Sequence, residues 1–144
     1  MTVAFEGKVA WLQLRIDYHF SPMSYKQEQV LDELLQSPGP MAANELWERM
    51  RANHSGIGLA TVYRALNRGV DEGRLVAVGL EPGAVRYEAA NLAHHHHFLC
   101  SSCDRAFDLK GCVRSIERLL PEGFEMTNHE ILLYGLCADC RNAS

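Results

Sequence analysis

Hydrophobic positions in the first half of the chain recur at helical spacing in three separate stretches, 24–35, 44–52 and 59–70. In the third stretch they repeat every three or four residues, as an amphipathic helix packed on a core requires. These positions are Leu59, Val62, Leu66 and Val70. A Ser-Pro-Gly-Pro break at 37–40 and a Gly-Ile-Gly at 56–58 separate the stretches. The pattern therefore predicts three short helices.

Two β-prone runs follow at 75–80 and 84–89, and Glu81-Pro82-Gly83 between them predicts a hairpin. Three helices followed by a hairpin is the order of a winged helix-turn-helix. The sequence thus predicts an N-terminal winged-helix DNA-binding domain over 1–89. Its first twenty residues fit either a helix or an arm.

The remaining chain predicts a smaller unit, joined by a hinge at 90–93. Its pattern indicates short strands near 95–100, 105–109, 124–129 and 131–136, and a helix at 113–120. We therefore expect an α+β protein, with a small C-terminal α/β dimerisation and metal-binding domain over 94–144.

Composition and charge limit the classes of function. About half of the 144 residues are apolar (47%), but no apolar run is long enough to span a membrane and no secretory leader opens the chain. The formal net charge of −4 argues against a broad basic footprint, so any DNA binding must depend on local charge. We expect a soluble protein that does not enter a membrane.

Four of the five cysteines form two Cys-x-x-Cys pairs, at Cys100, Cys103, Cys137 and Cys140. Each pair turns the chain so that both sulfurs face one point, and two pairs make a tetrahedral zinc site. A closed four-sulfur site leaves no open coordination position, which indicates a structural rather than a catalytic ion. The alternative is four reduced cysteines in a core. Zinc thiolates fit a reducing compartment, so the expected location is the cytoplasm.

A run of four histidines, His94 to His97, ends three residues before the first cysteine pair. On a strand, His94 and His96 would point to one face and His95 and His97 to the other, so one strand could supply two regulatory metal sites. The candidate partners of His95 and His97 are Glu88, Asp108 and, as a thiolate, Cys112; those of His94 and His96 are Glu117 and His129. The alternatives are a solvated histidine-rich loop and, for Cys112, a buried small apolar residue.

The third predicted helix carries a polar face suited to DNA. Its outward residues are Thr61, Tyr63, Arg64, Asn67 and Arg68. Arginine can contact phosphates or guanine, and tyrosine can stack or touch a thymine methyl group. From the pattern alone, an ordinary amphipathic helix is the alternative.

Three motifs together resemble the ferric uptake regulator (Fur) superfamily. They are the stretch 58–64 (GLATVYR), the histidine run with the first Cys-x-x-Cys pair, and Thr127-Asn128-His129 ahead of Tyr134-Gly135-Leu136-Cys137. The resemblance spans roughly 24–140 in one consistent order. It implies a homodimeric transcriptional repressor with a winged helix, a hinge and a C-terminal dimerisation domain, acting on double-stranded operator DNA, an AT-rich inverted repeat.

Carried over residue by residue, the resemblance implies that Tyr63 and Arg64 contact the operator and that the four paired cysteines hold structural zinc. Glu88, His95 and His97 match a sensing site near the hinge, and Asp108 matches a carboxylate that some members use. His94, His96 and His129 match a second regulatory site, with Glu117 as the expected carboxylate. Where many members have aspartate between the histidines, this chain has His96.

One departure concerns the winged helix. Members often draw a sensing ligand from a position just before the second winged-helix helix, where this chain has Pro40-Met41. His19 or His54 could take that role, or Glu88 alone could link the domains.

The imidazole-rich sites favour zinc, and zinc uptake regulators are the expected branch of the superfamily. Iron(II) or manganese(II) at the regulatory sites is the alternative, with iron- or peroxide-sensing as the function. Two other classes are a zinc hydrolase or deaminase and a zinc-stapled interaction module. The first would need a general base in a pattern such as His-Glu-x-x-His, which is missing, so no enzyme activity is expected.

Overall fold

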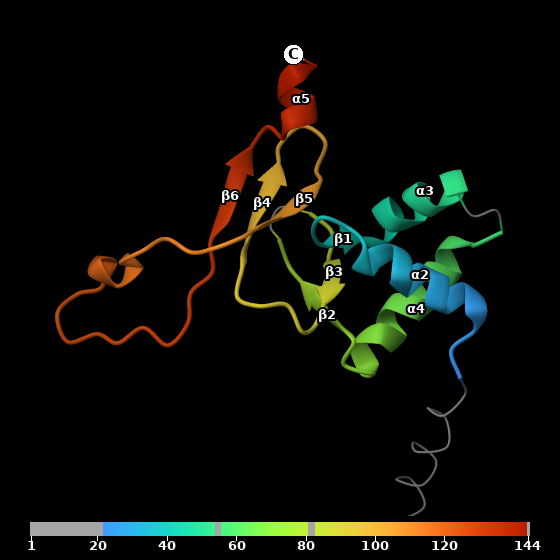
Figure 1. The fold of residues 1–144 in the computed structure, drawn as a ribbon, viewed down its shortest axis with the longest axis horizontal. Helices are drawn as coiled ribbons and strands as arrows, with labels where there is room; N and C mark the ends of the chain where they lie inside the picture. The colour runs from blue at the N-terminus through green and yellow to red at the C-terminus, as the bar shows by residue number, and fades with distance from the viewer. Residues whose placement is uncertain (1–21, 54–55, 81–82, 144) are drawn as a thin grey trace, which may run out of the picture.

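The computed structural model describes residues 22–53, 56–80 and 83–143 (Figure 1). The expectations for residues 1–20, including His19, and for His54 lie outside the described residues. The N-terminal half contains α2 (Tyr25–Leu35), β1 (Met41–Ala42), α3 (Ala43–Asn53), α4 (Leu59–Asp71), β2 (Leu75–Val78) and β3 (Arg86–Ala89). This order is that of a winged helix-turn-helix.

Helix α2 begins where the sequence supplies a capping box. The Ser24 side chain accepts a hydrogen bond from the Gln27 backbone N–H, and the Gln27 side chain accepts one from the Ser24 N–H. One face of the helix buries Val30, Leu31 and Leu34 against α4. The helix therefore has a fixed start and a fixed inner face.

Helix α4 buries a stripe at Val62, Ala65, Leu66 and Gly69. Gly69 is required for close packing, because a Cβ atom there would lie 2.8 Å from Leu75 Cδ1. The expectation that Val70 belongs to this inner face is wrong: its side chain is 36% exposed. Successive helical residues turn by about 100°, which moves Val70 off the stripe that Gly69 completes.

The wing is an antiparallel sheet with strand order β1-β3-β2. Val78 pairs with Arg86 and Leu75 with Ala89 across β2 and β3, so the predicted hairpin is present. Alternation along β3 buries Arg86 and Glu88, which places a buried carboxylate at the end of the wing.

The C-terminal half contains β4 (His96–Cys100), β5 (Ala106–Leu109), the short 3₁₀-helix η1 (Ile116–Leu119), β6 (Leu132–Gly135) and α5 (Ala138–Asn142). Its sheet has the order β5-β4-β6, with β4 antiparallel to β5 and parallel to β6. The α+β class is confirmed.

Two predicted elements of this half differ from the structure. The helix expected over 113–120 is reduced to η1, and no strand forms over 124–129. Apolar side chains that would anchor them are exposed: Val113 by 59%, Leu119 by 81% and Phe124 by 68%. A short helix or lone strand gains its stability from packing, and in a single chain this segment packs on little. Figure 1 shows it projecting from the sheet, away from the helices.

The two halves touch where the turn between α2 and β1 meets β5. The Asp108 N–H donates to the Pro38 carbonyl at 3.1 Å, and a Cβ atom on Gly39 would lie 2.7 Å from the Ala106 carbonyl oxygen. Leu80, which follows β2, packs with Leu99 and Ala106 of the C-terminal sheet. In the described part of the chain, no helix is both long and apolar enough to cross a membrane.

Candidate metal centres

Among the residues that the structure describes, three compact groups of histidine, cysteine and carboxylate side chains lie in or beside the C-terminal sheet. We name them the cysteine group (Cys100, Cys103, Cys137, Cys140), the hinge group (Glu88, His95, His97, Asp108) and the outer group (His94, His96, Cys112, His129). Within each group the candidate ligand atoms all lie within 4.8 Å of one another.

The cysteine group forms where the two ends of the C-terminal half meet. Parallel pairing of β4 with β6 places Cys100 opposite Gly135, and the Cys137 N–H donates to Cys100 Sγ at 3.4 Å. The Sγ atoms of Cys103 and Cys137 are 3.8 Å apart. A tetrahedron of Zn–S bonds has edges of about 3.8 Å, so this spacing fits one zinc ion.

Backbone hydrogen bonds lower the pKa values of Cys100 and Cys137 and so favour their thiolates. At Cys140 a hydrogen bond with Ser102 lowers the pKa, but contacts with Cys137 and Cys103 outweigh it and raise the pKa to about 12. Hydrogen bonds from the backbone at Cys103 and Cys137 lower the pKa of Cys100 to about 6. Arg105 donates to Cys103 Sγ at 3.3 Å and to Cys137 Sγ at 3.6 Å, and these contacts raise the pKa of its guanidinium. Thiolates are the form that binds zinc.

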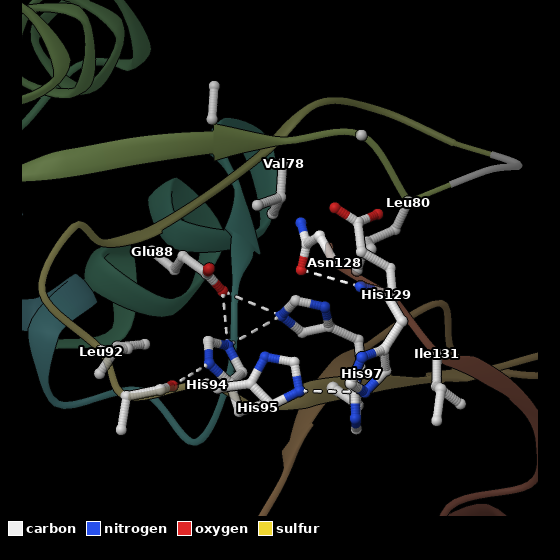
Figure 2. A pocket seen from close by; sticks show the side chains of 15 residues that line it. Val78, Leu80, Glu88, Leu92, His94, His95, His97, Asn128, His129 and Ile131 are labelled. Carbon is white, nitrogen blue, oxygen red and sulfur yellow. Dashed lines mark hydrogen bonds and ion pairs between the residues drawn. The ribbon is translucent and has the colours of Figure 1, made fainter. Parts of the chain in front are cut away.

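The hinge group joins the end of the wing to the C-terminal sheet. Glu88 Oε2 lies 3.0 Å from His97 Nε2 and 3.4 Å from His95 Nε2, and the two nitrogens are 3.2 Å apart (Figure 2). Asp108, paired with His97 across β4 and β5, places Oδ1 3.8 Å from both imidazoles. Tetrahedral zinc with nitrogen and oxygen ligands has edges of about 3.4 Å, so this group also fits one ion.

The pKa values of the two hinge-group carboxyls show which of them lacks a positively charged or hydrogen-bonding partner. Burial alone would raise the pKa of Glu88, but hydrogen bonds and charge attraction from His97 and His95 outweigh it and lower the pKa. Burial raises the pKa of Asp108, whose Oδ1 is buried without a hydrogen-bond donor. His95 Nδ1 lies 2.8 Å from the Ala93 carbonyl oxygen, which directs Nε2 into the group.

The outer group lies on the opposite face of the histidine run. His94 Nε2 is 3.3 Å from His129 Nε2, which is 2.9 Å from Cys112 Sγ. His96 is buried, with both ring nitrogens lacking a hydrogen-bond partner. Burial and the neighbouring His94 and His129 lower its pKa. A cleft of about 400 Å³ lies along the histidines and reaches both groups (Figure 2).

Two placements differ from the expectations for these sites. Cys112 was expected beside His95 and His97, but the structure places its sulfur with the other pair of histidines. Glu117, the expected carboxylate of that second site, lies exposed in η1 and belongs to none of the three groups. The turn after β5 returns Cys112 toward His129, whereas η1 carries Glu117 beyond it.

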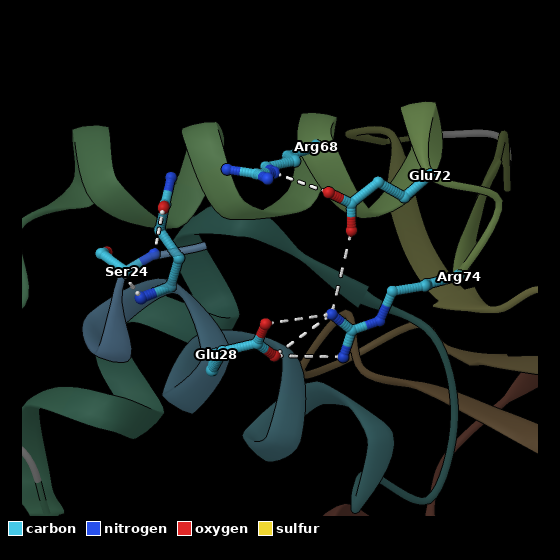
Figure 3. Close-up of polar contacts among 6 residues, drawn as sticks. Ser24, Glu28, Arg68, Glu72 and Arg74 are labelled. Atoms are coloured by element: carbon cyan, nitrogen blue, oxygen red, sulfur yellow. Dashed lines mark hydrogen bonds and ion pairs between the residues drawn. The ribbon is translucent and has the colours of Figure 1, made fainter. Parts of the chain in front are cut away.

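Helix α4 presents the expected polar face. Tyr63, Arg64 and Asn67 are exposed, and Arg64 Nη2 lies 3.3 Å from the Thr61 hydroxyl. Arg68 is paired with Glu72 at 2.7 Å, and Glu72 in turn approaches Arg74, which binds Glu28 (Figure 3). Basic charge on this face is therefore concentrated near the first half of the helix.

Arg86 is a further candidate residue, one that was absent from the expectations based on sequence. Its side chain is 1% exposed, and it donates to Glu45 of α3 at 2.9 Å and to the Asp104 carboxylate at 3.0 Å. Asp104 follows Cys103 directly, so this guanidinium connects the winged helix to the turn of the cysteine group. Side chains two residues apart on a strand point to the same face, so Arg86 could have been predicted to share a face with the candidate ligand Glu88.

The chain was also compared with known proteins. The model of the ferric uptake regulator family matches residues 22–134. The chain belongs to this family.

Curated members of the ferric uptake regulator family include close matches in sequence. The ferric uptake regulation protein of Escherichia coli K12 is 35% identical over 116 residues, covering 76% of this chain and 78% of that protein. The Vibrio cholerae ferric uptake regulator has a similar structure, with a TM-score of 0.64, 28% identity, and coverage of 88% of this chain and 99% of that one. A zinc-bound manganese uptake regulator shares the fold, with a TM-score of 0.71 at 23% identity, over 88% of this chain and 98% of that one.

Family membership confirms the coarse expectations about function. Members are metal-responsive, dimeric, DNA-binding transcription regulators and not enzymes. The chain is accordingly a metal-responsive regulator, and the hydrolase and deaminase alternatives are set aside.

Proposed function

We propose that this protein is a zinc-responsive, homodimeric transcriptional repressor of zinc-homeostasis genes, working in the cytoplasm. The observation that carries metal-controlled DNA binding is the hinge group, whereas the preference for zinc rests on the outer group. The four donors of the hinge group come from both halves of the molecule. The distances among the donor atoms of Glu88, His95 and His97, 3.0 to 3.4 Å, are close to the distance between two ligands of a tetrahedral zinc ion.

The hinge group explains how metal would control DNA binding. Glu88 ends the wing, whereas His95, His97 and Asp108 belong to the segment and sheet beyond the hinge at 90–93. When Glu88 and the histidines share one ion, the angle between the winged helix and the C-terminal domain is held. Shifting such an equilibrium from 1:99 to 99:1 takes about 5.5 kcal/mol, which a four-ligand site can supply.

Helix α4 is the proposed reading element. Tyr63 and Arg64 would contact bases or phosphates, with Thr61, Asn67 and Arg68 beside them. In a two-fold dimer, two such helices enter major grooves one helical turn, about 34 Å, apart, which fits an AT-rich inverted repeat. Arg64 is exposed and has no acidic partner among the described residues, so its charge is available to DNA.

The dimer surface is proposed to lie in the C-terminal half. Exposed apolar residues lie on β6 and directly after it, including Leu133 at 50% and Leu136 at 48% exposure. Val113, Leu119 and Phe124, in the segment between β5 and β6, are also exposed. Exposed apolar side chains gain free energy when a partner covers them, so we propose that these residues meet a second copy of the chain.

Zinc is proposed for the cysteine group as a structural ion and for the regulatory groups as the sensed ion. The outer group, with three imidazoles and one thiolate, is a soft donor set that favours zinc over iron or manganese. The hinge group, with two imidazoles and two carboxylates, also suits iron(II) or manganese(II). That donor set favours an iron-sensing or iron-dependent peroxide-sensing regulator as the second candidate.

The deciding experiment is fluorescence anisotropy on an AT-rich inverted-repeat duplex, with buffered free zinc, iron(II) and manganese(II) titrated separately. We expect zinc to switch on binding at far lower free concentration than the other two ions. Activation by iron(II) or manganese(II) at lower free concentration would assign the protein to iron or peroxide sensing.

Matched variants connect this response to the site. Glu88→Gln should lower the metal-activated DNA affinity by about tenfold or more, in the range of ordinary allosteric coupling. Glu125→Gln, an exposed carboxylate outside all three groups, should change nothing. Equal effects of the two variants would remove the hinge group from the mechanism.

A further inference from the structure

We propose that Cys112 is the fourth ligand of a His₃Cys metal site formed by the outer group, and that this thiolate makes the site selective for zinc over iron(II) and manganese(II). The inference deepens the proposed function by assigning the donors and preference of the second regulatory site. It rests on that function only for the regulatory meaning of the ion.

The geometry of the outer group supports a thiolate ligand. The 3.3 Å between His94 Nε2 and His129 Nε2 equals the edge of about 3.3 Å for a tetrahedron of Zn–N bonds. Cys112 Sγ lies 2.9 Å from the same His129 nitrogen, closer than the edge of about 3.5 Å expected for one sulfur and one nitrogen ligand. A rotation of the exposed Cys112 side chain is enough to open that distance.

His96 provides an independent observation that points to a ligand. Its side chain is 4% exposed, and neither ring nitrogen has a hydrogen-bond partner. A buried polar group without a partner costs free energy, so such groups are normally paired with protein, water or an ion. The ring packs edge-on against His94 at 4.6 Å between centroids and lies 5.1 Å from His129, which places it at the centre of the candidate site.

The donors come from three segments that flank the paired strands of the C-terminal sheet. His94 lies two residues before β4, His96 begins β4, Cys112 follows β5, and His129 precedes β6. Between Cys112 and His129, η1 is the only regular element in the structure described here. A shared ion would therefore fasten both ends of this projecting segment to β4.

The two regulatory groups then differ in donor chemistry although they share one histidine run. The outer group offers three nitrogens and one sulfur, and the hinge group two nitrogens and two carboxylates. Thiolate and imidazole ligands favour zinc and cobalt(II), whereas carboxylates accept iron(II) and manganese(II). The thiolate of Cys112 therefore gives the outer group a stronger preference for zinc than the hinge group has.

Cobalt(II) spectroscopy on the full-length protein tests this directly, because sulfur-to-cobalt charge transfer in the near ultraviolet appears only when a thiolate binds the ion. The protein is first loaded with one equivalent of zinc to fill the cysteine group, and cobalt(II) is then titrated. We expect a charge-transfer band in the wild-type protein and its loss in Cys112→Ser. Glu117→Gln, the matched control, should keep the full band.

Two results would overturn the inference. A band of equal intensity in Cys112→Ser would mean that the band arises from cobalt in the cysteine group and that Cys112 does not bind cobalt. Visible cobalt absorption without any charge-transfer band would mean that the outer histidines bind metal without Cys112.

A competition assay tests selectivity separately. Cys112→Ser should weaken zinc binding at the outer group by about tenfold or more while changing manganese binding little. Equal loss for both metals would refute the selectivity. The anisotropy experiment reports the proposed function independently: metal-dependent DNA binding with no thiolate band would leave that function standing and remove only this inference.

Discussion

The two halves of the molecule are stabilised in different ways. The winged helix surrounds a core of twelve buried apolar residues, among them Leu31, Leu46 and Leu66, all fully buried. In the C-terminal half, the buried apolar cluster contains Leu80, Leu99 and Ala106, and Leu80 comes from the wing. The same half carries three metal-ligand groups. We infer that hydrophobic burial holds one half and metal ligation the other.

The proposed sensing groups lie in or beside the half with the smaller core. We expect the half with the large core to fold without metal, so that the proposed recognition helix α4 stays folded in the metal-free protein. A half with a small core depends on ions for its order, so its shape responds to metal. In the proposed mechanism, a DNA-binding domain that folds without metal is joined to a C-terminal domain whose order depends on metal.

The largest expected effect is on the cysteine group. Cys100→Ser should remove most of the zinc-linked folding free energy, on the order of 10 kcal/mol at neutral pH, from the C-terminal half alone. Hydrogen–deuterium exchange should show loss of protection in β4 to β6, with α2 and α4 still protected.

Leu66→Ala is the matched control for the other half. Removing this fully buried side chain should cost about 3 kcal/mol in the winged helix, and added zinc should not restore it. If Cys100→Ser instead reduced protection evenly across both halves, the contrast between them would be wrong.

A smaller effect is expected where the halves meet, at Arg86. Arg86→Met removes the donor to Glu45 and Asp104 and leaves the partly buried Glu45 carboxyl without its partner. Urea unfolding followed by circular dichroism should show a loss of about 2 kcal/mol. Zinc removal should then no longer alter exchange in α3. An unchanged response of α3 to zinc would show that Arg86 does not connect the halves.

The smallest effect concerns pH and distinguishes the two regulatory groups. Burial alone would lower the pKa of His95, but the Ala93 carbonyl and Glu88 raise it above 6.5, whereas burial and neighbouring imidazoles lower that of His96. Ligand histidines must be neutral, so acidification should release metal from the hinge group first. Zinc titrations between pH about 7.5 and about 5.5 should show a steeper loss of zinc affinity in Cys112→Ser, in which the hinge group is intact and the outer group is weakened, than in Glu88→Gln, in which the hinge group is weakened.

In the metal-free protein, the contribution of His95 to folding stability should depend on pH in the opposite direction from zinc affinity. Because the pKa of His95 is raised, its contribution to stability is fully present below about 6.5 and is lost as pH rises through the folded value. The lowered pKa of Glu88 gives a contribution present above about 4.5 and lost on further acidification. The stability advantage of the metal-free wild-type protein over His95→Gln should therefore fall from pH about 6 to about 8, and an advantage that rises would contradict this assignment.

Much of the fold follows from local patterns. The helices α2, α3 and α4 and the wing appear where periodicity and turn residues predicted them, because each buries a face that its own sequence defines. The predictions fail at 113–120 and 124–129, where the apolar residues have no core of this chain to pack on. Packing that involves another chain is invisible to a single-chain pattern.

The sequence by itself determined the donors. Cysteine spacing and strand alternation assigned Cys100, His95 and His96 to the faces on which they lie, because period two and a tight turn are local geometry. Only the tertiary structure decided which distant residues complete each group. Cys112 joins the outer histidines, Glu117 joins none of the groups, and Arg86 connects the halves, because these contacts depend on how the turn after β5 and the wing pack against β4. No local periodicity encodes that packing.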